Sequence, residues 1–282
     1  MKSVYITLFA LFLVFTCPAA NAQENTAQDF PGLEEVTLRG RMLHAYDQAA
    51  WHGTDAVRPL MQDVQNLGEL ISGYVVKHEN NHFHVGFGRL SEDKSEFITV
   101  FEAYLDNQYS VMEVFKHEEP VYSTCFYHDA MMARQAVLEG FDPPEQVAYN
   151  TAVIPGPGET IYVFMMPAQP AINVYYLGAD FRYTFDTTSA TITDTTRLHN
   201  SMQTIDLRSQ APLTMSTAVL TDIPTETDVF FAISRPPSPR GQPNHLVIVE
   251  DGVFLIDQRG NISYMDRSEI NQGQPEIDSN QP

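Results

Sequence analysis

The stretch "ISGYVVKHENNHFHVGFGRL", residues 71–90, alternates apolar and polar side chains on both sides of Asn80 and Asn81. Alternation with a period of two predicts β-strands, and asparagine tolerates the left-handed backbone of a two-residue turn. Such a turn places Glu79 opposite His82 and separates apolar from polar side chains, whereas a three-residue loop mixes the two faces. We therefore expect a β-hairpin with the two-residue register.

The polar face of this hairpin carries His82 and His84 in an H-x-H spacing. Both rings then lie on one face, about 6.5–7 Å apart along the strand, a spacing that can chelate zinc. The register sends His78 to the opposite face and sets Lys77 beside His84, where its charge opposes a metal cation. Glu79 is the nearest candidate third ligand. His82, His84 and Glu79 are thus a metal-site hypothesis, and the alternative is a solvated strand face.

Helical spacing of apolar residues appears in two parts of the chain. It predicts a helix over residues 33–52 that stops at Gly53, followed by a short helix over 55–62. A second substantial helix is predicted over 128–141, ending at Gly140. These helices precede and follow the first run of strands.

Short alternating segments fill most of the remaining chain and predict β-strands. They cover residues 71–78, 82–90, 96–105, 108–117, 147–154, 160–167, 172–186, 190–199, 214–220, 228–234, 245–250, 253–257 and 262–265. Most neighbouring strands lack an intervening helix long enough for a parallel crossover. We expect an α+β fold, predominantly antiparallel β-sheet with an N-terminal helix and one central helix, over residues 23–265. Two sheet-plus-helix halves dividing near residue 145 are an open alternative.

The N-terminus has the features of a secretory signal peptide. Lys2 precedes an apolar run over residues 4–14, and Ala20-Asn21-Ala22 matches an A-x-A cleavage site. The apolar run is shorter than the roughly 20 residues that a membrane span needs. We expect residues 1–22 to be removed, and residues 266–282 to form a disordered polar tail. The mature protein would then be periplasmic or secreted, with no membrane span, and the composition looks bacterial.

The net charge limits which partners the chain can bind, and the cysteine count limits which disulfide bonds it can form. The chain has a formal net charge of −20, which argues against binding to nucleic acid. Removal of the signal peptide removes Cys17 and leaves Cys125 alone, so no intramolecular disulfide can form. We expect Cys125 to be buried in an oxidising compartment.

A second polar cluster is predicted from a hairpin in the second half of the chain. If the turn over residues 185–190 pairs its flanking strands, Asp180, Arg182 and His199 come near one another. The arginine could then bind a ligand that carries a carboxylate. A solvated strand face is the alternative.

Four segments resemble, in order and spacing, a group of exported bacterial proteins of unassigned function. The resemblance covers about residues 130–265. Its motifs are "MMARQAV" (131–137), "NTAVIPGPGETIYVFMMP" (150–167), "YYLGADFRYTF" (175–185) and "AVLTDIPTETDVFFAI" (218–233). Because that group has no assigned activity, the resemblance implies export and no residue role.

The sequence contains no G-x-S-x-G, Walker A or G-x-G-x-x-G motif. Residues 78–82 read H-E-N-N-H and match the letters of H-E-x-x-H, but they span the predicted hairpin turn, whereas that motif holds zinc from one face of a helix. We therefore expect a non-enzymatic, monomeric protein without a cofactor that binds a small molecule or interacts with an envelope protein. The alternative is a hydrolase that uses His82 and His84, with or without zinc.

Overall fold

A computed structural model describes residue 30 and residues 32–206, 214–217, 221, 223–235 and 245–268. Over these residues the chain has an α+β fold with mostly antiparallel sheets and an N-terminal helix, which confirms the predicted fold class. None of the helices in these ranges is long and apolar enough to cross a membrane.

The first sheet, sheet A, is the predicted antiparallel meander. Its strands are β1 (Gly73–Glu79), β2 (His82–Leu90), β3 (Phe97–Asp106) and β4 (Val111–Ser123), in the order β1-β2-β3-β4. Glu79 pairs with His82 across the turn. Asn80 and Asn81 have φ angles of 50° and 68°, which is the left-handed backbone that a two-residue hairpin turn requires. The predicted register is confirmed.

The N-terminal helix α1 (Leu33–Met61) is longer than predicted and does not stop at Gly53. A Cβ atom at Gly53 would lie 2.9 Å from a methyl group of Val85, so the glycine lets α1 approach sheet A closely. The separate short helix predicted over residues 55–62 is part of α1, and the Thr54 hydroxyl, just before it, donates to the Ala50 carbonyl oxygen at 2.6 Å within α1. A short helix, α2 (Leu67–Leu70), follows.

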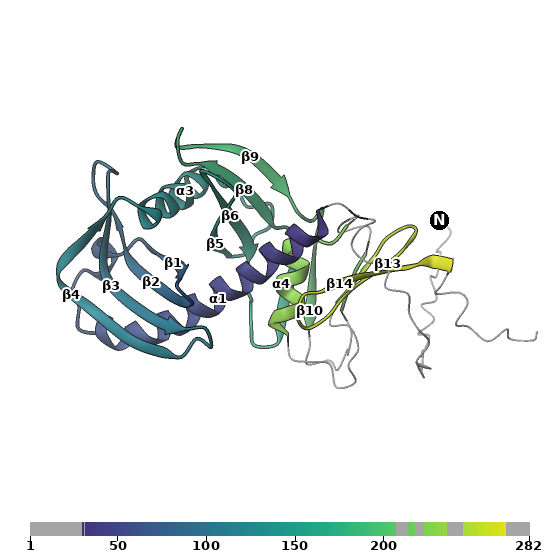
Figure 1. Cartoon of the computed structure of the whole chain (residues 1–282), viewed down its shortest axis with the longest axis horizontal. Helices are drawn as coiled ribbons and strands as arrows, with labels where there is room; N and C mark the ends of the chain where they lie inside the picture. The colour runs from purple at the N-terminus through teal and green to yellow at the C-terminus, as the bar shows by residue number, and fades with distance from the viewer. Residues whose placement is uncertain are drawn as a thin grey trace, which may run out of the picture.

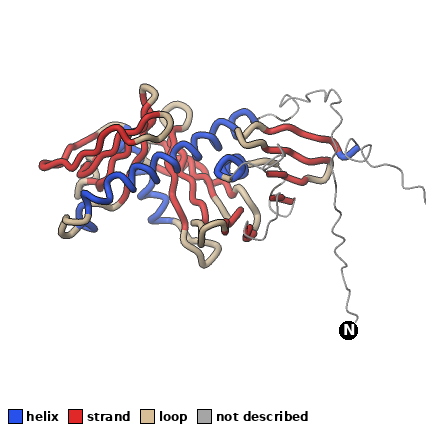
Figure 2. The backbone as a smooth tube through the Cα atoms, turned by 90° about the horizontal axis from the view of Figure 1, so that it is seen from below, coloured by secondary structure: helices blue, strands red, loops and turns tan. Residues whose placement is uncertain are grey.

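The helix α3 (Phe126–Gly140) and α1 cover opposite faces of sheet A. Gly53 of α1 lies against Val85, and Tyr127 of α3 lies against Gly86. Consecutive residues of a strand point to opposite faces, so the two helices enclose the sheet. Figure 1 shows α1 running beneath sheet A and onward past β5 to α4, and Figure 2 shows the same crossing from below. The helix α3 ends at Gly140, as predicted.

The second sheet, sheet B, begins just after residue 145. Its strands are β5 (Tyr149–Pro155), β6 (Thr160–Pro167), β8 (Phe181–Asp186) and β9 (Thr191–Arg197), in the order β5-β6-β8-β9. One hydrophobic core, which includes Val85 of sheet A and Val163 of sheet B, extends through both sheets. The chain therefore changes sheet near residue 145 without leaving this core.

The single strand predicted over residues 172–186 is wrong. The chain forms two strands there, β7 (Val174–Gly178) and β8, and β7 pairs with β10 (Met202–Asp206) in a separate ribbon. Gly178 and Ala179 have φ angles of 94° and 55°, which end the extended backbone. A Cβ atom at Gly178 would lie 2.0 Å from the Ser201 carbonyl oxygen, so only glycine fits at this break.

The strand predicted over residues 228–234 is also wrong, because this segment is the helix α4 (Glu226–Ser234). Thr225 and Asp228 form a capping box: the Thr225 hydroxyl accepts from the Asp228 amide, and the Asp228 carboxylate accepts from the Thr225 amide at 2.9 Å. This T-x-x-D signature starts a helix. It overrides the strand preference of the apolar residues that follow.

The last sheet contains β11 (Thr214–Thr217), β12 (His245–Ile248), β13 (Gly252–Ile256) and β14 (Ile262–Asp266). The β11–β12 pair is parallel, and α4 lies between these strands in the chain. This sheet and α4 share a second hydrophobic core that includes Val229 and Phe254. The predicted signal peptide, and the predicted tail beyond residue 268, lie outside the described residues.

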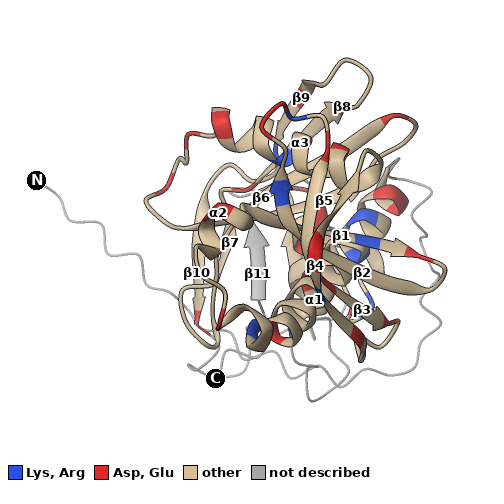
Figure 3. Cartoon of the chain, turned by 90° about the vertical axis from the view of Figure 1, so that its left-hand side faces the viewer, with Lys and Arg blue, Asp and Glu red and all other residues tan. Residues whose placement is uncertain are grey.

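Acidic residues outnumber basic residues by 36 to 16 in the whole chain. Figure 3 shows them spread over strands, helices and loops rather than gathered on one element.

Candidate functional site: a cleft between two sheet edges

The histidine pair of the metal-site hypothesis lies on the same face of sheet A as Gly86, the face that α3 covers in part. Glu79 is directly opposite His82, but its carboxylate accepts from the Lys77 ammonium group at 2.8 Å. The His84 ring packs against Tyr104 with 4.3 Å between the ring centroids. No group of three or more His, Cys, Asp and Glu side chains within the described ranges is arranged to hold a metal ion. The arrangement of these side chains therefore does not support the zinc hypothesis, which stays a prediction.

The predicted polar cluster of the second half contains a buried contact. The imidazole of His199 donates through Nδ1 to Asp180 at 2.7 Å and through Nε2 to Asp228 of α4 at 3.2 Å. His245 reaches the same Asp228 oxygen through its Nε2 at 2.9 Å. His199 is 1% exposed and Asp228 is 0% exposed. The structure thus brings Asp180 and His199 together inside the protein rather than on a solvated face.

Arg182 lies beside this cluster, but its hydrogen bonds go to other residues than Asp180 and His199. Its guanidinium donates to the carboxylate of Glu226, the first residue of α4, and to the Thr196 hydroxyl. Arg39 of α1 donates to the same Glu226 oxygen at 2.7 Å. The cluster therefore fastens α4 to sheet B and to α1. The ligand role predicted for Asp180, Arg182 and His199 stays a prediction.

The expectation that Cys125 is buried is wrong, because its side chain is exposed. Cys125 is the N-cap residue of α3. The Ser123 hydroxyl lies 3.1 Å from its sulfur. That hydroxyl, the Tyr127 amide and the charge of Lys77 together lower the pKa of the thiol, against a smaller opposing effect of burial.

We expect Cys125 to react with iodoacetamide at a lower pH than an unstructured cysteine, because the thiolate is the reacting form. The measurement is the alkylation rate as a function of pH, with a cysteine in a short peptide as reference. Ser123→Ala should move the midpoint toward the reference value, because Ser123 makes the largest contribution to the shift. Identical midpoints in the unmodified chain and the peptide would contradict this prediction.

A cleft lies where α1 passes between two sheet edges. β1 is an edge strand of sheet A and β5 is an edge strand of sheet B, and the two are not paired with each other. Two adjoining cavities lie between these edges and share Tyr46 of α1. We call them the polar cavity and the apolar cavity, and together the Tyr46 cleft.

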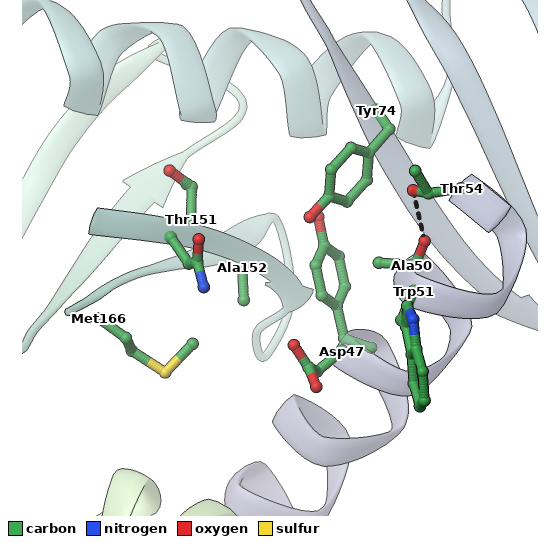
Figure 4. Close-up of a pocket in the computed structure, with 10 residues that line it drawn as sticks. Asp47, Ala50, Trp51, Thr54, Tyr74, Thr151, Ala152 and Met166 are labelled. Carbon is green, nitrogen blue, oxygen red and sulfur yellow. Dashed lines mark hydrogen bonds between the residues drawn. The ribbon is translucent and has the colours of Figure 1, made fainter. Parts of the chain in front are cut away.

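The polar cavity has a volume of about 230 Å³. Successive turns of α1 contribute Asp47 and Trp51 to its wall, because residues four apart lie on one helix face. Figure 4 shows these side chains and Tyr74 of β1 on one side of the cavity, with Thr151 and Met166 of sheet B on the other. The cavity therefore has mixed aromatic and polar walls.

The hydroxyl group of Tyr46 is the strongest sign that this cleft receives a ligand. Tyr46 is only 5% exposed, and its hydroxyl has no hydrogen-bond partner among the described residues. Burial raises the pKa of the phenol well above its usual value, and the nearby Val153 amide lowers it without reaching hydrogen-bond geometry. Leaving a buried hydroxyl unpaired costs about 1–3 kcal/mol. A ligand with a polar group can remove that cost.

The apolar cavity has a volume of about 390 Å³. Its walls come from four elements around Tyr46: Met42 and Ala45 of α1, Val76 of β1, Phe126 of α3 and Ile154 of β5. Lys77 and His78 also line it. This volume lies within the roughly 300–1,000 Å³ of small-molecule sites, which are mostly apolar with a few polar groups.

The sequence did not reveal this cleft. Tyr46 falls in the apolar stripe that predicts the helix over residues 33–52, and Asp47 lies beside that stripe. The available signal was a row of polar residues, Asp47 and Thr54, beside that stripe at helical spacing. These polar residues indicate a ligand site only once it is known that α1 crosses from sheet A to sheet B.

No protein-family model and no curated protein matches this chain. The resemblance of residues 130–265 to exported bacterial proteins therefore stays a prediction.

Proposed function

We propose that this chain is an exported, non-catalytic binding protein whose small organic ligand occupies the Tyr46 cleft. The observation that carries the proposal is the buried hydroxyl of Tyr46, which has no hydrogen-bond partner in the described part of the chain and whose side chain lines both cavities. Buried polar groups in proteins are nearly always paired. Export rests on the predicted signal peptide over residues 1–22.

The arrangement of the walls favours binding without large rearrangement. The cleft lies between two sheets and two helices that share one packed core. Val76 and Ile154, on facing edge strands, are 5% and 2% exposed and are held by this core. A site with walls this well packed is largely formed before the ligand arrives, which lowers the entropic cost of binding.

We expect small apolar probes such as indole and cyclohexanol to bind the unmodified chain in saturation-transfer NMR. Ala45→Phe should abolish this signal, because Ala45 lines the apolar cavity and a phenyl group would fill part of it. Leu38→Phe is the matched control, because it places the same aromatic ring at a position of α1 that is 59% exposed. Leu38→Phe should bind as the unmodified chain does.

The proposal fails if neither probe binds the unmodified chain. It also fails if Ala45→Phe binds both probes as tightly as Leu38→Phe does.

A further inference from the structure

The carboxylate of Asp47 has no counter-ion among the residues that the structure describes. Asp47 is half-buried and lines the polar cavity. Within the described ranges, its carboxylate accepts one long hydrogen bond from the Gln48 amide, at 3.4 Å, and forms no ion pair. Burial raises the pKa of this carboxyl group. Since burying a carboxylate is costly unless it is paired, a cation in the cavity would stabilise the site.

The protein's nearby cation does not fill this role. Arg134 of α3 is close enough to lower the pKa of both Tyr46 and Tyr74. Its guanidinium donates to the Ser72 carbonyl oxygen at 3.3 Å, and it is not a lining residue of the polar cavity. The negative charge of Asp47 is therefore left for a ligand.

Aromatic side chains surround the same space. Trp51 stands at the rim and is 57% exposed, which is unusual for so large an apolar side chain. The ring of Tyr74 is tilted by 33° against that of Tyr46, with 6.2 Å between the ring centroids, and both residues line the cavity. Aromatic faces attract cations. Aromatic rings beside an unpaired carboxylate recognise organic ammonium ions better than hydrated metal ions, which prefer several oxygen ligands.

We propose that the polar cavity binds a small organic ammonium ion, with its charged nitrogen at the Asp47 carboxylate and its carbon groups against Trp51 and Tyr74. This inference rests on the proposed function and specifies the ligand class of the same cleft. The neutral alternative, a hydroxyl compound that pairs only with Tyr46, is an outcome of the test below.

The test compares each cation with an uncharged molecule of nearly the same shape. Choline is paired with 3,3-dimethylbutan-1-ol, and propylammonium is paired with propan-1-ol. Trp51 is the only tryptophan in the chain, so its fluorescence reports binding at the rim of this cavity. We expect at least one cation to bind roughly tenfold more tightly than its neutral partner, which is a difference typical of a single charge-assisted contact.

Asp47→Asn keeps the size of the side chain and removes the charge. In this variant, the cation and its neutral partner should bind with about the same affinity. The matched control is Asp55→Asn, because Asp55 is an exposed residue of the same helix that pairs with Arg58. This control should keep the full preference.

A measurement on the unmodified chain avoids any folding defect of Asp47→Asn. Cation binding should weaken as pH falls through the raised pKa of Asp47, and binding of the neutral partner should not. Asp47 is the acid that titrates there among the lining residues, because burial raises the pKa values of Tyr46 and Tyr74 further above that range.

The inference is overturned if the neutral partners bind as tightly as the cations, or if no cation binds. In either case the proposed function survives when indole or cyclohexanol still binds the apolar cavity. If indole and cyclohexanol also do not bind, the proposed function is contradicted as well.

Discussion

Replacing Asp228 by alanine is expected to lower the free energy of unfolding by about 3–5 kcal/mol, because it leaves buried partners without their counter-charge. His199 and His245 both contact the Asp228 carboxylate, at 3.2 Å and 2.9 Å. The same side chain closes the capping box of α4 by accepting from the Thr225 amide. Urea unfolding followed by circular dichroism measures the change.

The control for this prediction is Glu34→Ala, which removes an exposed carboxylate from the first turn of α1. It should change the free energy of unfolding by less than about 0.5 kcal/mol. If Asp228→Ala behaves like this control, the buried cluster does not hold α4 in place.

The same cluster should give the unmodified chain a defined pH window of stability. Burial opposes the charged form of His199, but Asp180 and Asp228 outweigh it and raise the pKa of the imidazole well above 6.5. Burial likewise opposes ionisation of Asp228, but His199 and His245 hold its pKa well below 3.8. The contribution of His199 is complete below pH 6.5 and is lost as pH rises through the raised pKa. The contribution of Asp228 is complete above pH 3.8 and is lost as pH falls through the lowered pKa.

Replacing Gly88 by alanine is expected to lower the free energy of unfolding by about 3 kcal/mol or more, at the upper end of the cost of overpacking. A Cβ atom at Gly88 would lie 1.9 Å from the carbonyl oxygen of Ile98. This contact is with the backbone of the neighbouring strand, so it cannot be relieved by rotating a side chain. Gly88 also sits at the register shift between β2 and β3. Urea unfolding measures the loss.

Gly86→Ala is a matched control two residues earlier in the same strand. Its nearest neighbour would be the ring of Tyr127 at 3.3 Å, which a small movement of a side chain relieves. Its cost should be about 1 kcal/mol or less. Equal losses for the two variants would show that the β2–β3 register differs from the one described.

The hairpin and the meander could be predicted because their signals are local. Asn80 and Asn81 define the turn, and a one-residue slip would expose the apolar residues of both strands. The β8–β9 hairpin, expected from the turn after Phe185, is present for the same reason. The pairing of strands that follow one another along the chain can be predicted without knowing the rest of the fold.

The errors come from residues whose role depends on distant contacts. Gly53 resembled a helix stop, but it is the point where α1 meets Val85 of β2. Gly178 resembled an ordinary strand residue, but the Ser201 backbone excludes any side chain there. The helix α4 is a different case, because its capping box at Thr225 and Asp228 is a local signal in the sequence that competes with the strand preference of the apolar residues after it.

The candidate site could not be predicted because it is assembled from separate parts of the chain. One hairpin is enough to place Asp180 near His199, but their partner Asp228 belongs to α4, a segment whose apolar residues favour a strand. The Tyr46 cleft needs α1, β1 and β5 at once. No short sequence motif predicts how these three elements are placed relative to one another.

The most direct test of the Tyr46 cleft is methyl NMR of the alanine residues during titration with indole or choline. Ala45 and Ala152 line the apolar and polar cavities, respectively, and Ala232 lies in the separate core under α4. We predict saturable chemical-shift changes at Ala45 with indole and at Ala152 with choline, with Ala232 unchanged. Changes centred on Ala232, or no saturable change at either cleft methyl, would contradict a ligand site in this cleft.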